Sequence, residues 1–175
     1  MGLASIIYLD DPTQTTALDT TKPHLGAPGR PGELRFHVHE DYGFQVYQLR
    51  LNESGGALVA YDGVELAATT VTAVMASALQ LTIAQVSDTG TICHDWGGVP
   101  QVAVADDEWC WCLIEGTGLL NTLTLSAKNA VIECAAAGDF DDTSGTGLKI
   151  GKQVGATVGT ATTATAVTLT RGGNA

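Results

Sequence analysis

The residues with the clearest chemical potential lie at 108–116, where the run EWCWCLIEG alternates two cysteines with two tryptophans. On an extended strand Cys110 and Cys112 point to one face, and two thiolates at this spacing are able to ligate a soft metal. A complete site would need Cys93 and Cys134 to converge on them, and the chain has no C-x-x-C pair. We therefore predict buried free thiols.

The two faces of this segment are both apolar. Cys110 and Cys112 share one face with Ile114, whereas Trp109 and Trp111 occupy the other face. Burial of only one face does not account for this pattern. We predict that the cysteine face packs in the β interior and that the tryptophan face lies under another sheet, an N-terminal arm or a neighbouring subunit.

A second candidate for chemistry is the pair His37 and His39, which also share one face of an extended segment. A zinc ion would need one or two further ligands, and Glu33, Asp41 and His94 are the available donors. The alternative is a polar, solvent-facing side of an edge strand, and we favour it. Neither a metal nor a cofactor is predicted.

Motifs of common enzyme classes are absent from the sequence. It contains no G-x-S-x-G, no H-E-x-x-H and no Walker loop. The acidic run DFDDTSGTG at 139–147 lacks the register of a calcium-binding EF-hand loop and is interpreted as a solvated turn. A catalytic triad that meets only in space leaves no motif, but no nucleophile stands beside a base, and we predict that the protein is not an enzyme.

Charge narrows the range of partners. The 175 residues include 19 acidic and 8 basic side chains, which gives a net charge of −11. Such a surface repels nucleic-acid phosphates and anionic membrane surfaces. Charged residues make up only 15% of the chain, against about 25% in ordinary soluble domains. Part of the surface is therefore expected to be covered in the working state.

The first 32 residues differ in composition from the rest of the chain. Four of the five prolines lie in 1–32, and proline disfavours both helices and central strands. We predict an extended N-terminal arm over 1–32, with an apolar patch that docks on this chain or on a neighbour. The residues of this patch are Ile6, Ile7, Tyr8 and Leu9. Deleting 1–20 is expected to leave the remaining domain folded.

The second region, 33–175, reads as a single β domain. Residues 33–40 and 44–52 alternate apolar and polar side chains with the period of a strand. Turn signals recur every eight to twelve residues, which is typical of compact β-sandwiches and barrels of short antiparallel strands. The segment 69–87 is ambiguous, and we read it as two strands with room for one short helix between them.

Three segments of this region carry a recognisable pattern. The first is FQVYQLRLNESGGALVAYDGVELA at 44–67, the second is GGVPQVAVADDEWCWCLIEG at 97–116, and the third spans 131–172. Through them the chain resembles the decoration, or cement, proteins of tailed bacteriophage heads over 44–172. The matching positions of the second segment are Gly98, Val99, Gln101, Ala103, Val104, Trp109, Trp111 and Gly116. Cys110 stands where that family usually has a glycine.

The resemblance implies a function by contact. Such proteins bind the outer surface of HK97-type capsids, commonly as homotrimers, and bridge subunits of the major capsid protein. They have no catalytic residues to carry over. The expected location is the outside of the virion, after synthesis in the host cytoplasm. The candidate contact residues are Ile6, Ile7, Tyr8 and Leu9 of the arm, with Trp109 and Trp111.

Other functions stay open at this point. A phage tail or baseplate β-protein is the alternative within the virion. A glycan-binding or small-molecule-binding β-barrel would use Trp96, Trp109 and Trp111 as a stacking platform. A metal enzyme of the cupin type is suggested only by His37 and His39, and the further ligands of that class are not recognisable.

Overall fold

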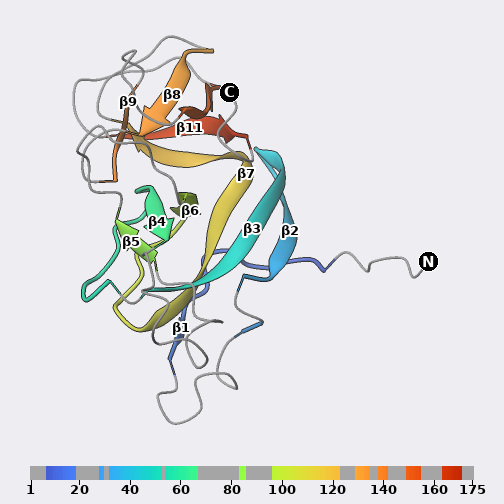
Figure 1. Cartoon of the computed structure of the whole chain (residues 1–175). Coiled ribbons are helices and arrows are strands. Elements are labelled where there is room, and N and C mark those ends of the chain that lie inside the picture. The colour runs from blue at the N-terminus through green and yellow to red at the C-terminus, as the bar shows by residue number, and fades with distance from the viewer. Residues whose placement is uncertain are drawn as a thin grey trace.

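The protein is all-β. A computed structural model describes residues 7–18, 28–29, 32–52, 54–66, 83–85, 96–122, 129–134, 138–141, 149–154 and 163–170. These residues form a closed β-barrel with additional strands and contain no helix, which confirms the predicted fold class (Figure 1). Of the ambiguous segment 69–87, only the strand at 83–85 lies within the described residues.

Most strands are short, and one long strand joins them. The strands of the described residues are β1 (Thr16–Ala17), β2 (Leu34–His39), β3 (Gly43–Asn52), β4 (Val64–Leu66), β5 (Ile83–Gln85), β6 (Trp96–Pro100), β7 (Glu108–Thr122), β8 (Val131–Cys134), β9 (Phe140–Asp141), β10 (Lys149–Gln153) and β11 (Thr163–Leu169). The β7 strand pairs with β1, β3, β6, β9 and β11, and only its pairing with β9 is parallel.

The β7 strand continues through Gly116, although glycine usually weakens the interior of a strand. Its first half runs beside β3 and its second half beside β11, with a bend between them (Figure 1). Gly116 has a φ of +99°, and a Cβ atom there would lie 2.5 Å from the carbonyl oxygen of Phe44. Only glycine permits this bend beside a neighbouring strand, because it has no side chain.

A β-bulge beside this bend changes which residues of β7 face inward. Val46 pairs with Glu115 and Tyr47 pairs with Leu113, so Ile114 is an extra residue on β7. Before the bulge, the odd-numbered residues of β7 face the main core. After the bulge, the buried positions are the even-numbered ones, because the extra residue shifts the alternation by one. The first set is Trp109, Trp111 and Leu113, and the second is Gly118, Leu120 and Thr122.

The interior contains two clusters. The main core is made of Leu9, Tyr47, Leu49, Leu51, Val99, Trp109, Trp111, Leu113, Leu120, Ile132, Phe140, Ile150, Val167 and Leu169. The second, smaller cluster is made of Leu58, Val64, Val104, Cys110 and Cys112. Both faces are buried as predicted. The tryptophans share their cluster with Leu9 of the predicted arm, and the cysteine face is buried in the smaller cluster. The tryptophans fill the main core, and the cysteines pack under the segments around Leu58 and Val104.

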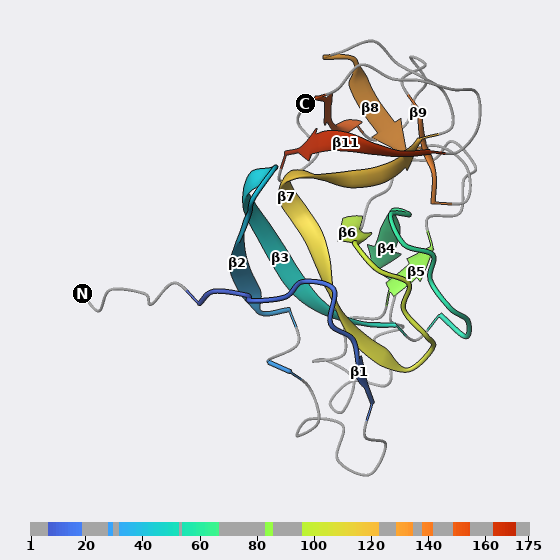
Figure 2. The ribbon, with the colours of Figure 1, turned by 180° about the vertical axis from the view of Figure 1, so that it is seen from behind.

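Residues 7–18, called the strap below, are packed onto the barrel. Leu9 N–H donates to Phe36 O over 2.7 Å, and Leu18 N–H donates to Asp107 O over 2.7 Å. The strap thus runs from the outer edge of β2 to β7, and it crosses β2 and β3 on the way (Figure 2). The described part of the predicted arm therefore docks on its own chain, and Leu9 is buried in the main core.

Candidate functional site

The two histidines share one face, as the alternation suggested, and both make structural contacts. His37 Nδ1 lies 2.8 Å from Leu9 O, which ties β2 to the strap. The ring of His39 stacks on Tyr42 with centroids 4.6 Å apart, and its Nδ1 accepts a hydrogen bond from Asp41 N–H. The described residues contain no group of three or more potential metal ligands. His94, one of the suggested donors, lies outside them.

The cysteine pair is buried and reduced. Cys110 Sγ and Cys112 Sγ lie 3.7 Å apart in the second cluster. The hydrogen bond with Cys112 and the burial of the thiol raise the pKa of Cys110 well above its ordinary value. A protonated thiol is a poor nucleophile and a poor metal ligand. The geometry therefore favours packing over reactivity for this pair. Cys93 and the side chain of Cys134 lie outside the described residues.

The tryptophans are covered within the chain itself. Trp109 is 1% exposed and Trp111 is 2% exposed. The strap covers them, and the guanidinium of Arg35 lies 4.8 Å from the ring centroid of Trp111. Neither indole offers a surface to a partner, so both are removed from the candidate contacts. The predicted stacking platform does not form either, because the half-buried Trp96 packs edge-on against Phe140 with centroids 6.0 Å apart.

Exposed apolar side chains gather where the strap meets the β2–β3 hairpin. Their exposed fractions are 47% for Ile7, 61% for Tyr8, 62% for Val38 and 56% for Phe44. Tyr8 bridges to Phe36, whose ring stacks on Phe44 at 5.2 Å, and Val38 is the cross-strand partner of Phe44. We call Tyr8, Phe36, Val38 and Phe44 the hairpin apolar surface. Ile7 precedes Tyr8 on the extended strap, so its side chain points to the opposite face.

The arm residues predicted as contacts thus have different positions. Tyr8 belongs to the hairpin apolar surface, Ile7 is exposed on the opposite face of the strap, and Ile6 lies outside the described residues. Leu9 is 7% exposed, so it is a core residue that fixes the strap rather than a contact with a partner.

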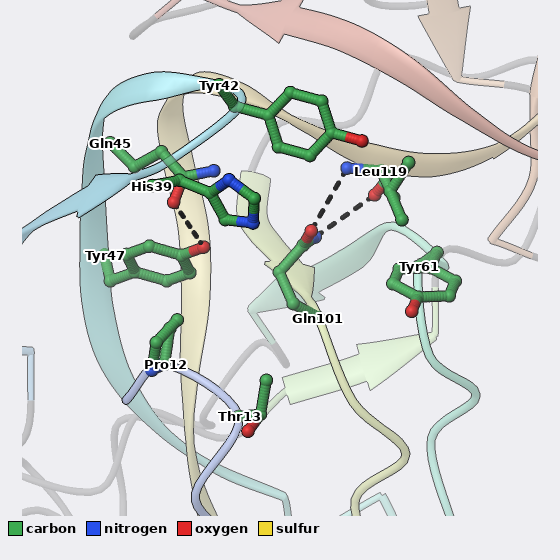
Figure 3. A pocket seen from close by; sticks show the side chains of 9 residues that line it. All are labelled: Pro12, Thr13, His39, Tyr42, Gln45, Tyr47, Tyr61, Gln101 and Leu119. Atoms are coloured by element: carbon green, nitrogen blue, oxygen red, sulfur yellow. Dashed lines mark hydrogen bonds between the residues drawn. The ribbon is translucent and has the colours of Figure 1, made fainter. Parts of the chain in front are cut away.

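A separate pocket of about 130 Å³ opens between the strap and the barrel (Figure 3). Its walls come from the strap, the end of β2 and the turn after it, β3, β7 and the loops that precede β4 and follow β6. The lining residues are Pro12, Thr13, His39, Tyr42, Gln45, Tyr47, Tyr61, Gln101 and Leu119. Aromatic rings and uncharged polar groups thus converge from segments far apart in the sequence.

Internal hydrogen bonds fix two walls of this pocket. Gln101 Nε2 donates to Leu119 O over 3.1 Å, and Gln101 Oε1 accepts from Leu119 N–H over 3.1 Å. On the opposite wall Tyr47 OH donates to Gln45 Oε1, and Gln45 Nε2 donates to Thr117 O. The pocket is therefore formed before any ligand arrives.

Tyr61 enters this pocket from a strained backbone position. Its φ is +71°, which is unusual for a bulky side chain and costs roughly 1–3 kcal/mol. Its N–H donates to Pro100 O and its carbonyl accepts from Asn121 N–H, each over 2.9 Å. The sequence analysis did not single out Tyr61, because a tyrosine with positive φ leaves no signal in a single sequence.

A buried acid follows Tyr61. Asp62 is 6% exposed, and its Oδ1 accepts a hydrogen bond of 2.7 Å from Asn121 Nδ2. Burial raises the pKa of Asp62, and the hydrogen bond only partly opposes this shift. Burial, together with the charge of Asp62, also raises the pKa of Asp139. Ionisation of these carboxyls therefore opposes folding.

We expect Asp62→Asn to raise the stability of the protein at neutral pH. A raised folded-state pKa means that the stabilising protonated form is fully present below the ordinary value of 3.8 and is lost as the pH rises through the folded-state pKa. The gain over the parent should therefore vanish below about pH 4. Urea denaturation at several pH values measures it. Asp10→Asn, at an exposed position, is the control, and equal gains from both substitutions would contradict the assignment.

Comparison with protein-family models, curated proteins and solved structures gave no match. Within the part of the chain that the structure describes, no helix has the length and apolar character needed to cross a membrane. The function is therefore inferred from the surfaces and the pocket of this chain and from its sequence pattern.

Proposed function

We propose that this protein is a structural virion component, a decoration protein that binds the outer surface of an HK97-type phage capsid. The observation that supports it best is the hairpin apolar surface, where Tyr8, Val38 and Phe44 are each more than half exposed. Contiguous exposed apolar patches mark sites of interaction. The sequence resemblance supplies the class of partner, the major capsid protein.

The hairpin apolar surface is suited to rigid docking. Leu9 anchors the strap in the main core directly after Tyr8, so the Tyr8 side chain is held on the surface. Phe44 is held by its ring contact with Phe36 and by strand pairing. A surface that is ordered before binding loses little conformational entropy when a partner covers it.

In this proposal the protein acts as a homotrimer, and each trimer bridges several capsid subunits. One small apolar surface supplies a modest affinity, and three linked copies multiply it through effective concentration. The net charge of −11 keeps the protein from binding nucleic acids nonspecifically. No chemical step is involved, and the stabilisation of the shell follows from the contacts alone.

We expect the double variant Tyr8→Ser, Phe44→Ser to lose affinity for purified shells of the cognate major capsid protein on the order of tenfold or more. Both side chains are exposed, so the barrel should stay folded. Co-sedimentation with shells measures binding, and circular dichroism checks the fold.

The matched control is Val59→Ser, Val154→Ser, which removes two exposed apolar side chains outside this surface. It should bind shells as the parent does. Decoration by the Tyr8, Phe44 variant at the parent's affinity, or an equal loss in the control, would contradict the proposed contact.

A further inference from the structure

We propose that the pocket beside Tyr61 binds a single neutral sugar residue in its pyranose form. This inference rests on the pocket alone and does not depend on the capsid proposal. The pocket lining and the hairpin apolar surface share no residue, so the two functions are separable by substitution.

The size of the pocket limits the ligand to about one ring. Its volume is about 130 Å³, whereas pockets for drug-sized ligands measure about 300–1,000 Å³. Figure 3 shows Tyr47 on one side, Gln101 and Tyr61 on the other, and Pro12 with Thr13 below. Such a site has room for one terminal sugar, with the remainder of a glycan outside.

The polar groups that remain available match the hydroxyl groups of a sugar. The Tyr42 and Tyr61 hydroxyls have no hydrogen-bond partner within the described chain, and Nδ1 of His39 is occupied by Asp41 N–H. Nε2 of His39 is thus left for a ligand, and its ring lies between Tyr42 and Gln101 in the pocket (Figure 3). Tyrosine hydroxyls both donate and accept, and the Nε2–H of His39 donates because Nδ1 accepts from Asp41 N–H, so these groups suit sugar hydroxyls.

The apolar part of the lining fits the C–H face of a pyranose. Tyr42, Tyr47 and Tyr61 contribute aromatic rings, and Pro12 and Leu119 add apolar contact. Aromatic side chains combine a large contact area with a polar tip, which suits a ligand that has both kinds of surface.

Charge disfavours an anionic ligand. The nine lining residues include no lysine, arginine or carboxylate. The carboxylate of Asp11 accepts hydrogen bonds from N–H and Oγ1–H of Thr13, which is a lining residue. A cation such as choline is the main competitor, because aromatic rings and nearby acids also attract quaternary ammonium groups.

The backbone conformation of Tyr61 supports a ligand site independently of the chemistry of the pocket lining. Glycine or asparagine would adopt a φ of +71° at lower cost than tyrosine. Two backbone hydrogen bonds maintain this strained conformation. Asn121 N–H of β7 donates to the Tyr61 carbonyl, and Tyr61 N–H donates to Pro100 O, so the ring is fixed at the pocket wall. Strained positions of this kind concentrate at ligand sites, so we infer that the ring of Tyr61 is retained for binding.

The test is a titration of the full chain, followed by nuclear magnetic resonance, with the methyl pyranosides of glucose, galactose, mannose and N-acetylglucosamine. At least one should give saturable shifts at the pocket residues, with a dissociation constant on the order of 1 mM. Choline chloride and inorganic phosphate should give none. Saturation by choline alone, or no saturable shift with any of the four glycosides, would overturn the proposal.

Two substitutions separate binding from folding. Tyr61→Asn suits the positive φ, so thermal stability should be kept while affinity for the glycoside falls at least about tenfold. Tyr42→Phe removes only one hydroxyl and should weaken binding without changing the fold. Tyr8→Asn, outside the pocket, should bind the glycoside as the parent does. Parental affinity in Tyr61→Asn would refute the assignment, even if the capsid contact is correct.

Discussion

Replacing Trp109 with alanine should lower the free energy of unfolding by about 3–5 kcal/mol. Trp109 is 1% exposed, and on β7 it lies between Leu51 of β3 and Thr16 of β1. Its Nε1–H has no hydrogen-bond partner among the described residues, so the loss reflects packing and the cavity left behind. Guanidinium chloride denaturation, followed by circular dichroism, measures this effect.

Two controls accompany this substitution. Trp109→Phe keeps an aromatic ring and removes the unpartnered N–H, so its cost should be clearly smaller than that of alanine. Phe44→Ala, at an exposed aromatic, should change stability by no more than about 0.5 kcal/mol. A cost below about 1 kcal/mol for Trp109→Ala would show that the indole is not packed in the main core.

Truncating Leu9 should cost about 2–5 kcal/mol, although it lies in a segment whose sequence suggests an independent arm. The side chain is 7% exposed and belongs to the main core. Leu9→Ala leaves the backbone hydrogen bond to Phe36 O intact, so the substitution isolates the contribution of the side chain. Chemical denaturation measures the loss.

The control for Leu9 stands two residues away. Ile7→Ala removes a side chain that is 47% exposed and should change stability by no more than about 0.5 kcal/mol. Equal costs at both positions would mean that the strap does not dock as described.

The sequence-based expectation for deletion of 1–20 changes accordingly. That deletion removes Leu9 and β1, so it should destabilise the barrel, and surface substitutions are the better test of partner contacts.

The alternation of apolar and polar side chains predicted those elements of the fold that depend on neighbouring residues in the sequence. The strands β2 and β3 follow from side chains that alternate between faces. The double-sided burial of Trp109 and Cys110 was also predictable, because both faces of that strand are apolar. These features depend on neighbours along the chain.

Features that depend on distant segments were not predictable in this way. The continuation of β7 through Gly116 requires the Phe44 carbonyl beside it, and the choice of core face requires the strap over the tryptophans. Both are tertiary contacts between segments far apart in sequence. The pocket was missed for the same reason, since Pro12, Tyr61 and Leu119 meet only after the barrel closes.

The position of β7 among its five partners has a kinetic consequence. Its first half must find β3 and its second half must find β11, and each partner lies more than forty residues away along the chain. Closing such long loops costs entropy before any contact compensates for it, so the barrel should fold slowly. Because each half of the structure is completed by the same strand, neither half is expected to persist without the other, and unfolding should proceed as one cooperative step.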